Sequence, residues 1–379
     1  MDHAAEARFK DLMLKHAAPP LDPPPLDAAH AARLLDRTAN VPFFAHSYSF
    51  YRSMEHGFAP RDLLDFVYAH DLHGACLHLN DGGETSVGRM SGEEREVFRR
   101  QLEDLGLALH LEISSTDRKE VDRAIDCALA LDVRNIRLYA RHQGPLSEVM
   151  ERVYADLAYA CERAHQLDLH FDYEQHEDLR AAEIAAILQR LGDSRMNALF
   201  DYSNSLNAYE EPLAALRILA PFIRQVHIKG ARKTVEGAGW GQIGVPQGCE
   251  EDELPGARML HDLLMLGDGM RQVICFALEQ EVDYYAPAFR LRNEPDNPVI
   301  RYREPSETPQ DKSKSTERLI ADERRWAVQQ LTWNRALVAT FRELAFQVVP
   351  DRRDRALPPL AGLPEASYAM KGAPKVMER

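Results

Sequence analysis

Four stretches of the sequence end on a side chain that can bind a metal ion or transfer a proton. Each stretch is a short apolar run typical of a buried strand, with its ionisable residue at or near the C-terminal end. In chain order these residues are Glu174, Asp201, His227 and Glu279. Three carboxylates and one imidazole suit a divalent cation such as Mn²⁺, Mg²⁺, Co²⁺ or Zn²⁺. The pattern therefore predicts one divalent-metal site assembled from the ends of four strands.

These stretches continue an alternation of strands and helices along the chain. Strands are expected at 43–47, 74–79, 108–113, 135–140, 169–176, 196–202, 222–228 and 273–279. Helical patterns lie at 60–70, 91–105, 117–131, 146–166, 179–191, 212–219, 254–266 and 316–346. Eight strand–helix units predict an α/β protein with a parallel (β/α)₈ TIM barrel, whose active site lies at the C-terminal ends of the strands. A doubly wound open sheet is the alternative, but no Gly-x-Gly-x-x-Gly turn follows the first strand.

The chain divides into four parts on this interpretation. Residues 1–40 form an N-terminal arm, with a short helix and a proline-rich spacer, that packs on the body or on a neighbouring subunit. Residues 41–285 form the barrel with the metal site, including a glycine-rich loop at 234–255. A polar, proline-rich loop at 286–315 is expected to be a lid or an oligomer contact. Residues 316–379 hold the last barrel helix and a C-terminal tail.

Composition indicates which kinds of molecule the protein is expected to bind and in which compartment it is expected to act. The 379 residues carry a formal net charge of −14, which disfavours binding to a nucleic-acid backbone. Five scattered cysteines without a Cys-x-x-Cys pair indicate reduced thiols, and hence a cytoplasmic protein. The sequence shows no signal-peptide pattern and no apolar run of about 18 residues, which predicts no membrane association. We expect a small-molecule, carbohydrate-type substrate and a homo-oligomer.

The ordered set Glu174, Asp201, His227 and Glu279 resembles the metal site of the xylose isomerase-like TIM barrels. That family includes tagatose and psicose epimerases, inosose isomerases and dehydratases, and endonuclease IV. The specific matches are His227-Ile-Lys229 and Asp201-Tyr-Ser-Asn204, within a barrel that covers roughly residues 41–285. The resemblance implies that the four residues bind one divalent metal ion, with Mn²⁺ first among the candidates. It also implies that Glu174 and Glu279 form the acid–base pair.

Two departures from the family pattern bear on the substrate. Endonuclease IV has a histidine where this chain has Asn204, and an Asp-x-His pair that is missing from Trp240–Gln242. These differences, with the acidic net charge, argue against DNA repair. The sugar epimerases usually have aspartate where this chain has Gly230, and they lack a long segment after the eighth strand. The substrate is therefore expected to differ from a free ketose, or to be larger.

Further side chains at strand ends or in the adjoining loops are candidates for binding the substrate. Arg137 or Arg141 would bind a substrate carboxylate, and Lys229 would polarise an oxygen or support a ligand carboxylate. The full set of substrate-binding candidates is His46, His78, Glu112, Arg137, Arg141, His176, Asn204, Lys229 and Trp240.

The leading hypothesis for function is an isomerase or epimerase that acts on a sugar or polyol derivative through a metal-stabilised enediolate. The alternative on the same scaffold is a metal-dependent lyase, such as a dehydratase, a decarboxylase or a C-glycoside-cleaving enzyme. The alternative of another class is a barrel that binds a sugar derivative without turning it over.

Overall fold

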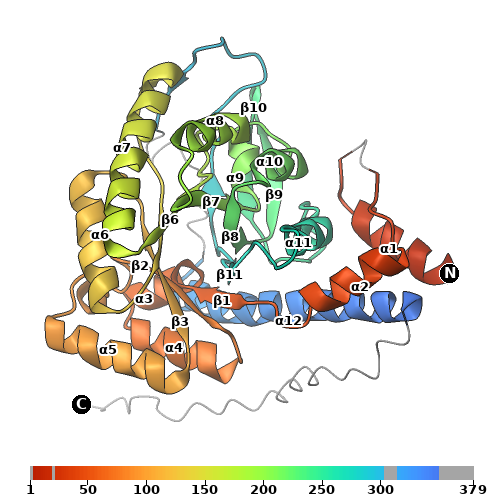
Figure 1. Cartoon of the computed structure of the whole chain (residues 1–379), viewed down its shortest axis with the longest axis horizontal. Helices are drawn as coiled ribbons and strands as arrows, with labels where there is room; N and C mark the ends of the chain where they lie inside the picture. Colours follow the sequence, from red (N-terminus) through yellow and green to blue (C-terminus); the bar gives the residue numbers. More distant parts are fainter. Residues whose placement is uncertain (1–2, 19–21, 303–313, 350–379) are drawn as a thin grey trace.

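Eight parallel strands close into a barrel, as the sequence predicts (Figure 1). The computed structural model describes residues 3–18, 22–302 and 314–349. The barrel order is β1-β11-β8-β7-β6-β4-β3-β2, and every neighbouring pair is parallel. The strands are β1 (Phe43–His46), β2 (Gly74–His78), β3 (Ala108–Ile113), β4 (Asn135–Leu138), β6 (His170–Glu174), β7 (Met196–Asp201), β8 (Ile223–Ile228) and β11 (Cys275–Leu278).

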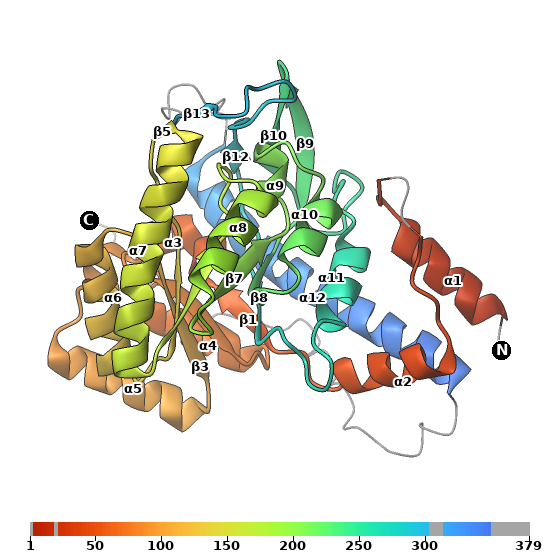
Figure 2. The same cartoon turned by 45° about the horizontal axis from the view of Figure 1, so that its top comes forward.

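Helices surround the barrel on its outer side (Figures 1 and 2). The longer ones are α4 (Pro60–Ala69), α5 (Gly92–Leu105), α6 (Arg118–Ala130), α7 (Leu146–Leu167), α8 (Ala181–Leu191), α10 (Pro212–Leu219), α11 (Gly256–Leu264) and α12 (Thr316–Val348). Short helical turns lie after three of the strands: η1 (Ser47–Phe50), α3 (Tyr51–Glu55), η2 (Gly83–Thr85) and α9 (Asn204–Asn207). Among the described residues, no helix is both long and apolar enough to cross a membrane.

Local sequence explains where these elements begin and which way they face. Helix α5 begins after Ser91, whose hydroxyl accepts from the backbone N–H of Glu94 while the Glu94 carboxylate accepts from that of Ser91. In β3, alternate side chains point to opposite faces. Leu111 joins the apolar core, whereas His110 and Glu112 point into the barrel, where they meet residues of β8. This alternation is what brings polar side chains to the inside of the barrel.

The N-terminal arm packs on the protein's own barrel. Helix α1 (His3–Leu14) lies against α12 and α11, and its Phe9 and Met13 are buried. A second helix, α2 (Ala28–Arg37), follows the proline-rich stretch and packs along α12 (Figure 1). It starts at Asp27, whose carboxylate accepts from the backbone N–H of His30. The predicted spacer therefore gives way to a helix that covers one end of α12.

The glycine-rich segment after β8 was predicted to be a loop, and that prediction is wrong. It forms a hairpin of β9 (Ala231–Glu236) and β10 (Gly239–Gly244), which β12 (Tyr285–Ala286) extends to three strands. Glycine is required at 241, because a Cβ there would lie 2.7 Å from the carbonyl oxygen of Ala286. The glycines therefore permit close strand pairing here, and do not mark an irregular loop.

The described part of the polar segment after β11 contains two short strands, β12 and β13 (Val299–Ile300). Strand β13 pairs with β5 (Gly144–Pro145), and Figure 2 shows this pair and the three-stranded sheet at the same end of the molecule. Arg290 anchors the segment, since it is 1% exposed and forms ion pairs with Glu183 and Glu294. Residues 303–313 of the predicted lid lie outside the described part of the chain.

Candidate metal and active site

The four predicted ligands come together at the C-terminal end of the barrel. Glu174 ends β6, Asp201 ends β7, His227 lies in β8, and Glu279 directly follows β11. The Nδ1 atom of His227 lies 3.2 Å from Oε2 of Glu279, 3.6 Å from Oε1 of Glu174 and 4.0 Å from Oδ2 of Asp201. All four side chains are buried, with at most 5% of any residue exposed.

This arrangement fits a divalent cation. Nitrogen and oxygen ligands bind Zn²⁺ at about 2.0–2.2 Å, so neighbouring ligand atoms of a tetrahedral site lie roughly 3.3–3.6 Å apart. Nδ1 of His227 lies 3.2, 3.6 and 4.0 Å from the nearest oxygens of Glu279, Glu174 and Asp201, and these distances span that range. The carboxylates around Nδ1 are also paired with cationic side chains: Oδ2 of Asp201 and Oε2 of Glu279 lie 2.9 Å from Nζ of Lys229, and Oε2 of Glu174 lies 3.1 Å from Nε of Arg137. Three carboxylates therefore converge on one imidazole nitrogen, which is a donor set that suits a divalent cation.

Glu112 lies beneath this group and orients it. Its carboxylate accepts from Nε2 of His227 at 3.1 Å and from Nε2 of His46 at 2.8 Å, and it forms an ion pair with Arg137 at 2.6 Å. With Nε2 of His227 donating to Glu112, Nδ1 is the nitrogen that faces the other carboxylates. A carboxylate behind a metal-binding histidine fixes the tautomer and the ring orientation in this way.

The charge of the cluster also favours a cation. Nζ of Lys229 lies 2.9 Å from Asp201, 2.9 Å from Glu279 and 3.1 Å from Glu281. Arg137 is the other permanent cation in the cluster. The carboxylates that these two cations and His227 contact number five: Glu112, Glu174, Asp201, Glu279 and Glu281. Buried carboxylates in excess of cations are costly. The raised pKa values of Glu281, from burial, and of His227, where burial is outweighed by Glu279 and Glu112, reduce this excess, and a divalent ion would relieve what remains.

The surroundings shift the pKa values of the cluster in opposite directions. Burial raises the pKa of Glu174, but the Arg137 guanidinium and His227 outweigh it and hold that pKa at about 2. Burial likewise raises the pKa of Glu279, yet His227 and Lys229 keep it well below the usual range. For Glu281 burial prevails, so its pKa is raised well above the usual range. Glu174 and Glu279 are thus ionised at neutral pH and able to accept a proton.

A cavity of about 590 Å³ opens above the cluster. Glu174 and Glu279 reach its wall, whereas Asp201, His227 and Glu112 lie below it. Seven of the predicted substrate-binding residues line the cavity, namely His46, His78, Arg137, Arg141, His176, Asn204 and Lys229. Its volume is typical of a site for a small molecule.

The structure corrects two of the predicted substrate contacts. Trp240 lies in the outer hairpin, where its ring packs 4.2 Å from that of Tyr209 and Nζ of Lys233 sits 4.0 Å above it. It is absent from the cavity wall because the segment around it forms a strand and not a loop that folds over the site. Glu112 is fully buried, and its carboxylate contacts His46, His227 and Arg137 below the cavity.

Several cavity residues were not predicted from the sequence. Glu281 follows Glu279 by two residues and Glu177 follows Glu174 by three, so proximity to the predicted ligands was an available signal. The aromatic wall includes Tyr139 and Tyr302. Tyr139 directly follows β4, whereas Tyr302 comes from the segment after β11, and no local pattern marked it.

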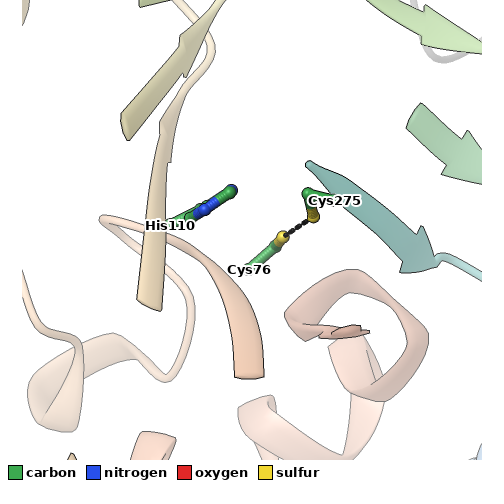
Figure 3. A group of neighbouring side chains, drawn as sticks. All are labelled: Cys76, His110 and Cys275. Atoms are coloured by element: carbon green, nitrogen blue, oxygen red, sulfur yellow. Dashed lines mark hydrogen bonds between the residues drawn. The ribbon is translucent and has the colours of Figure 1, made fainter. Parts of the chain in front are cut away.

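A second group of metal-type side chains lies deeper in the barrel, and it is satisfied internally. Figure 3 shows Cys76, His110 and Cys275 pointing toward one another from β2, β3 and β11. The two sulfur atoms are 3.6 Å apart. Nδ1 of His110 contacts the amide oxygen of Gln225 at 2.6 Å, and Nε2 contacts the amide of Asn135 at 3.2 Å. Burial raises the pKa of both thiols, so the group is a neutral, hydrogen-bonded layer of the core.

Comparison with known proteins agrees with the eight-stranded barrel fold. The profile of the xylose isomerase-like TIM barrel matches residues 64–274. The uncharacterized protein YihM of Escherichia coli (strain K12) is 35% identical over 317 residues, which cover 83% of this chain and 97% of YihM. The 3-oxo-isoapionate decarboxylase of Pectobacterium atrosepticum is 25% identical over 147 residues, which cover 38% of this chain and 52% of that enzyme.

Two solved structures share the fold at low sequence identity. A D-psicose 3-epimerase crystallised in the presence of D-fructose has a TM-score of 0.51 and 14% identity, and the match covers 79% of this chain and 99% of that one. The IolI protein with a bound zinc atom has a TM-score of 0.50 and 10% identity, over 77% of this chain and 98% of that one. From the closed eight-stranded barrel and the matched profile, we conclude that this chain belongs to the xylose isomerase-like TIM barrel family.

Proposed function

We propose that this protein is a divalent-metal-dependent isomerase or epimerase of a sugar or polyol derivative. The observation that supports the proposal most is the approach of Glu174, Asp201 and Glu279 to Nδ1 of His227, directly below a cavity of small-molecule size. A binding protein for a neutral sugar needs no such concentration of buried carboxylates, which are costly to keep without a cation.

The same four residues would hold the metal ion. Three carboxylates and one imidazole favour Mn²⁺ or Mg²⁺, with Co²⁺ and Zn²⁺ as further candidates. When bound, the ion would supply the positive charge that stabilises an enediolate as a C–H proton leaves the substrate. Glu112 would keep the His227 ring in place, and Lys229 would hold the Asp201 and Glu279 carboxylates.

Glu174 and Glu279 are placed to move the proton. They extend from β6 and β11, which β7 and β8 separate in the barrel, and both reach the cavity. A substrate above His227 and Asp201 therefore meets one carboxylate on each side. Both are ionised at neutral pH, so either one can take the proton. Inversion of the carbon centre would then require the opposite carboxylate to take up a proton from solvent and donate it to the other face, while the first carboxylate releases its proton to solvent.

Polar side chains of the cavity wall would orient the substrate hydroxyls. Nδ1 of His78 accepts from the backbone N–H of Asn80, so its Nε2–H donates to the hydroxyl of Ser114 at 3.1 Å. Ser114 also hydrogen-bonds to the phenol of Tyr139, so His78 is a positioning group for this part of the cavity wall. Asn204 bonds to Glu174 at 3.3 Å and lines the same cavity.

A lyase is the second candidate function. The partial sequence relative from Pectobacterium atrosepticum is a decarboxylase, and loss of CO₂ or of a leaving group would pass through the same stabilised enolate. Such a reaction would use the same metal ligands but need only one proton-transferring carboxylate.

Two measurements test the proposal. Metal analysis of protein purified without chelator should find one Mn, Mg, Co or Zn per chain. Incubation with candidate ketoses, inososes and oxo-sugar acids in D₂O should exchange a substrate α-proton, as detected by NMR. A protein without metal that also shows no metal-induced thermal shift contradicts the proposal. Product formation with release of CO₂ or water, instead of reversible exchange, would identify the lyase.

A further inference from the structure

One wall of the cavity is a stack of planar side chains around Arg141. The guanidinium lies between the rings of Tyr139 and Tyr302, at 4.8 Å and 4.9 Å from their centroids. The ring of His176 stacks on Tyr139 at 3.8 Å, with 11° between the planes. All four side chains line the cavity. The guanidinium is thus held at the cavity wall by two phenol groups, to which one N–H of each terminal nitrogen donates, and its remaining N–H groups can bind a ligand.

Arg141 differs from the other two strong cations of the cavity wall. Arg137 is bound to Glu112 and Glu174, and Lys229 is bound to three carboxylates. Within residues 3–18, 22–302 and 314–349, no carboxylate lies within 4.0 Å of Arg141 in an ion pair. It donates instead to two neutral groups, the phenol oxygens of Tyr302 and Tyr139. The Glu177 carboxylate of the same cavity wall acts on Arg141 from outside ion-pair distance, so the guanidinium can still pair directly with a ligand anion.

The two phenols add donors of their own. Because each phenol oxygen already accepts a hydrogen bond from Arg141, its own O–H hydrogen points elsewhere. Burial raises the pKa of Tyr139, which keeps that phenol protonated and able to donate. A fixed guanidinium with two flanking hydroxyl donors is the donor set that suits a carboxylate or phosphate oxygen.

We propose that Arg141, with Tyr139 and Tyr302, binds an anionic oxyacid group of the substrate. The substrate is then a sugar acid or a sugar phosphate, and its polyhydroxy part lies over the carboxylate cluster. This inference rests on the proposed function for the orientation of the substrate, but the anion subsite itself can be tested by binding alone. The carboxylates near the cluster would repel the anionic end, so the substrate is held in one direction along the cavity.

The test compares neutral and anionic members of matched pairs. Calorimetry would measure the Kd of D-fructose, D-fructuronate and D-fructose 6-phosphate, and of inositol, glucose and their acid or phosphate derivatives, with and without Mn²⁺. In at least one pair the anionic member should bind 10-fold or more tightly, because a hydrogen bond to a charged group contributes about 1.5–3 kcal/mol, or roughly 10- to 150-fold. Comparing the sugar acids with the sugar phosphates shows whether the site binds a carboxylate or a phosphate group.

Variants distinguish an anion-binding site at Arg141 from the overall electrostatic field of the protein. Arg141→Gln should lower the preference for the anionic member by about 10-fold or more, because the Kd of the anionic member rises much more than that of the neutral member. Arg301→Gln is the matched control, since it removes the same charge from an exposed residue beside Tyr302 that is not in the cavity wall. In the Arg301→Gln variant, the preference for the anionic member should change less than about twofold, because exposed charges are screened. Tyr302→Phe should retain part of the preference.

Two results would overturn the inference. One is a wild-type protein that binds no anionic member, or binds both members of every pair equally. The other is a preference that persists in Arg141→Gln. Exchange of the substrate α-proton is measured separately: exchange without anion preference refutes the anion subsite alone, and preference without exchange refutes the isomerase proposal alone.

Discussion

At the scale of single residues, the buried cluster around His227 contains two kinds of carboxylate. Some line the cavity, and others only contact and position the neighbouring side chains. Glu174 and Glu279 do both, since they approach His227 and also line the cavity. Glu112 never reaches the cavity, yet it contacts His46, His227 and Arg137. Substitutions at these two kinds of position should therefore affect turnover and metal affinity in different proportions.

Replacing Glu279 by glutamine should separate metal binding from proton transfer. The amide keeps an oxygen that can bind the metal ion, but it cannot accept a proton at neutral pH. We expect weakened but measurable metal occupancy and turnover that is lower by at least about 10²-fold. Glu174→Gln is the paired variant. Normal α-proton exchange in Glu279→Gln, with none in Glu174→Gln, would assign the base to Glu174 alone.

Replacing Glu112 by glutamine should weaken metal binding without unfolding the barrel. The amide has one oxygen in place of two and cannot accept from His46 and His227 while pairing with Arg137. Loss of such a supporting carboxylate typically lowers metal affinity 10–100-fold. Isothermal titration with Mn²⁺ measures it, and exposed Glu93→Gln is the control. Equal Kd values for Glu112→Gln and wild type would remove Glu112 from this role.

At the scale of elements, the segment after β11 closes the cavity on one side. Pro287, Phe289 and Tyr302 from this segment line the cavity. Arg290 holds the segment to the barrel through Glu183 of α8, and it also donates to the backbone carbonyl of Asp178 at 3.1 Å. The segment is thus anchored by a buried ion pair, which the expectation of a polar surface loop did not include.

Replacing Arg290 by alanine should destabilise this part of the protein. Breaking a buried ion pair by removing one partner costs about 3–5 kcal/mol. In this variant Glu183 loses its ion pair with Arg290, and Glu294 keeps only its ion pair with Arg180. Urea unfolding would measure the lower stability, and limited proteolysis would show faster cleavage within 286–302. Exposed Arg292→Ala should change the free energy of unfolding by less than about 1 kcal/mol. Identical curves for both variants would show that Arg290 is not an anchor.

At the scale of the whole molecule, the long helix α12 connects the N-terminal arm to the barrel. It packs against α1 and α2 along one part, and its Glu323 accepts from the hydroxyl of Ser53 and the backbone of α3. Figure 1 shows the arm beside α12, away from the barrel mouth. None of the described arm residues, 3–18 and 22–40, lines the cavity, so we expect the arm to affect stability and not ligand binding.

Phe9→Ala should lower global stability while leaving ligand binding unchanged. Phe9 is 1% exposed and lies against His30 and His261, with ring centroids at 6.2 Å and 5.4 Å. Truncating a buried phenylalanine costs about 3–5 kcal/mol. Thermal and urea unfolding would measure it, with half-exposed Leu14→Ala as the control. A loss no larger than that of the control would show that the arm is not part of the cooperative unit.

The pH dependence of stability should carry the signature of Asp178. Burial raises the pKa of this carboxyl from 3.8 to about 7. The folded state therefore holds the proton more tightly, so this group stabilises folding below pH 4 and loses that contribution as pH rises to about 7. The loss amounts to at most about 4 kcal/mol. Asp178→Asn should remove this part of the pH profile, whereas exposed Asp65→Asn should keep it; parallel profiles for wild type and Asp178→Asn would contradict the assignment.

The sequence by itself determined the barrel and which four side chains come together at its C-terminal end. Hydrophobic runs of strand length, each ending on Glu174, Asp201, His227 or Glu279, carry this information because strand C-termini of a parallel barrel meet at one face. Helix limits were also local properties, as the cap at Ser91 shows.

Only the tertiary structure decided which residues support these four side chains and which residues enclose the cavity above them. Glu112 looked like a substrate contact until its partners on β1, β4 and β8 placed it below the cavity. Trp240 looked like a loop residue because glycines surround it, although those glycines allow the hairpin strands to pair closely. Tyr302 and Arg141 are 161 residues apart in sequence, and only folding brings the phenol to the guanidinium. Contacts between residues far apart in the chain depend on packing, which no local pattern records.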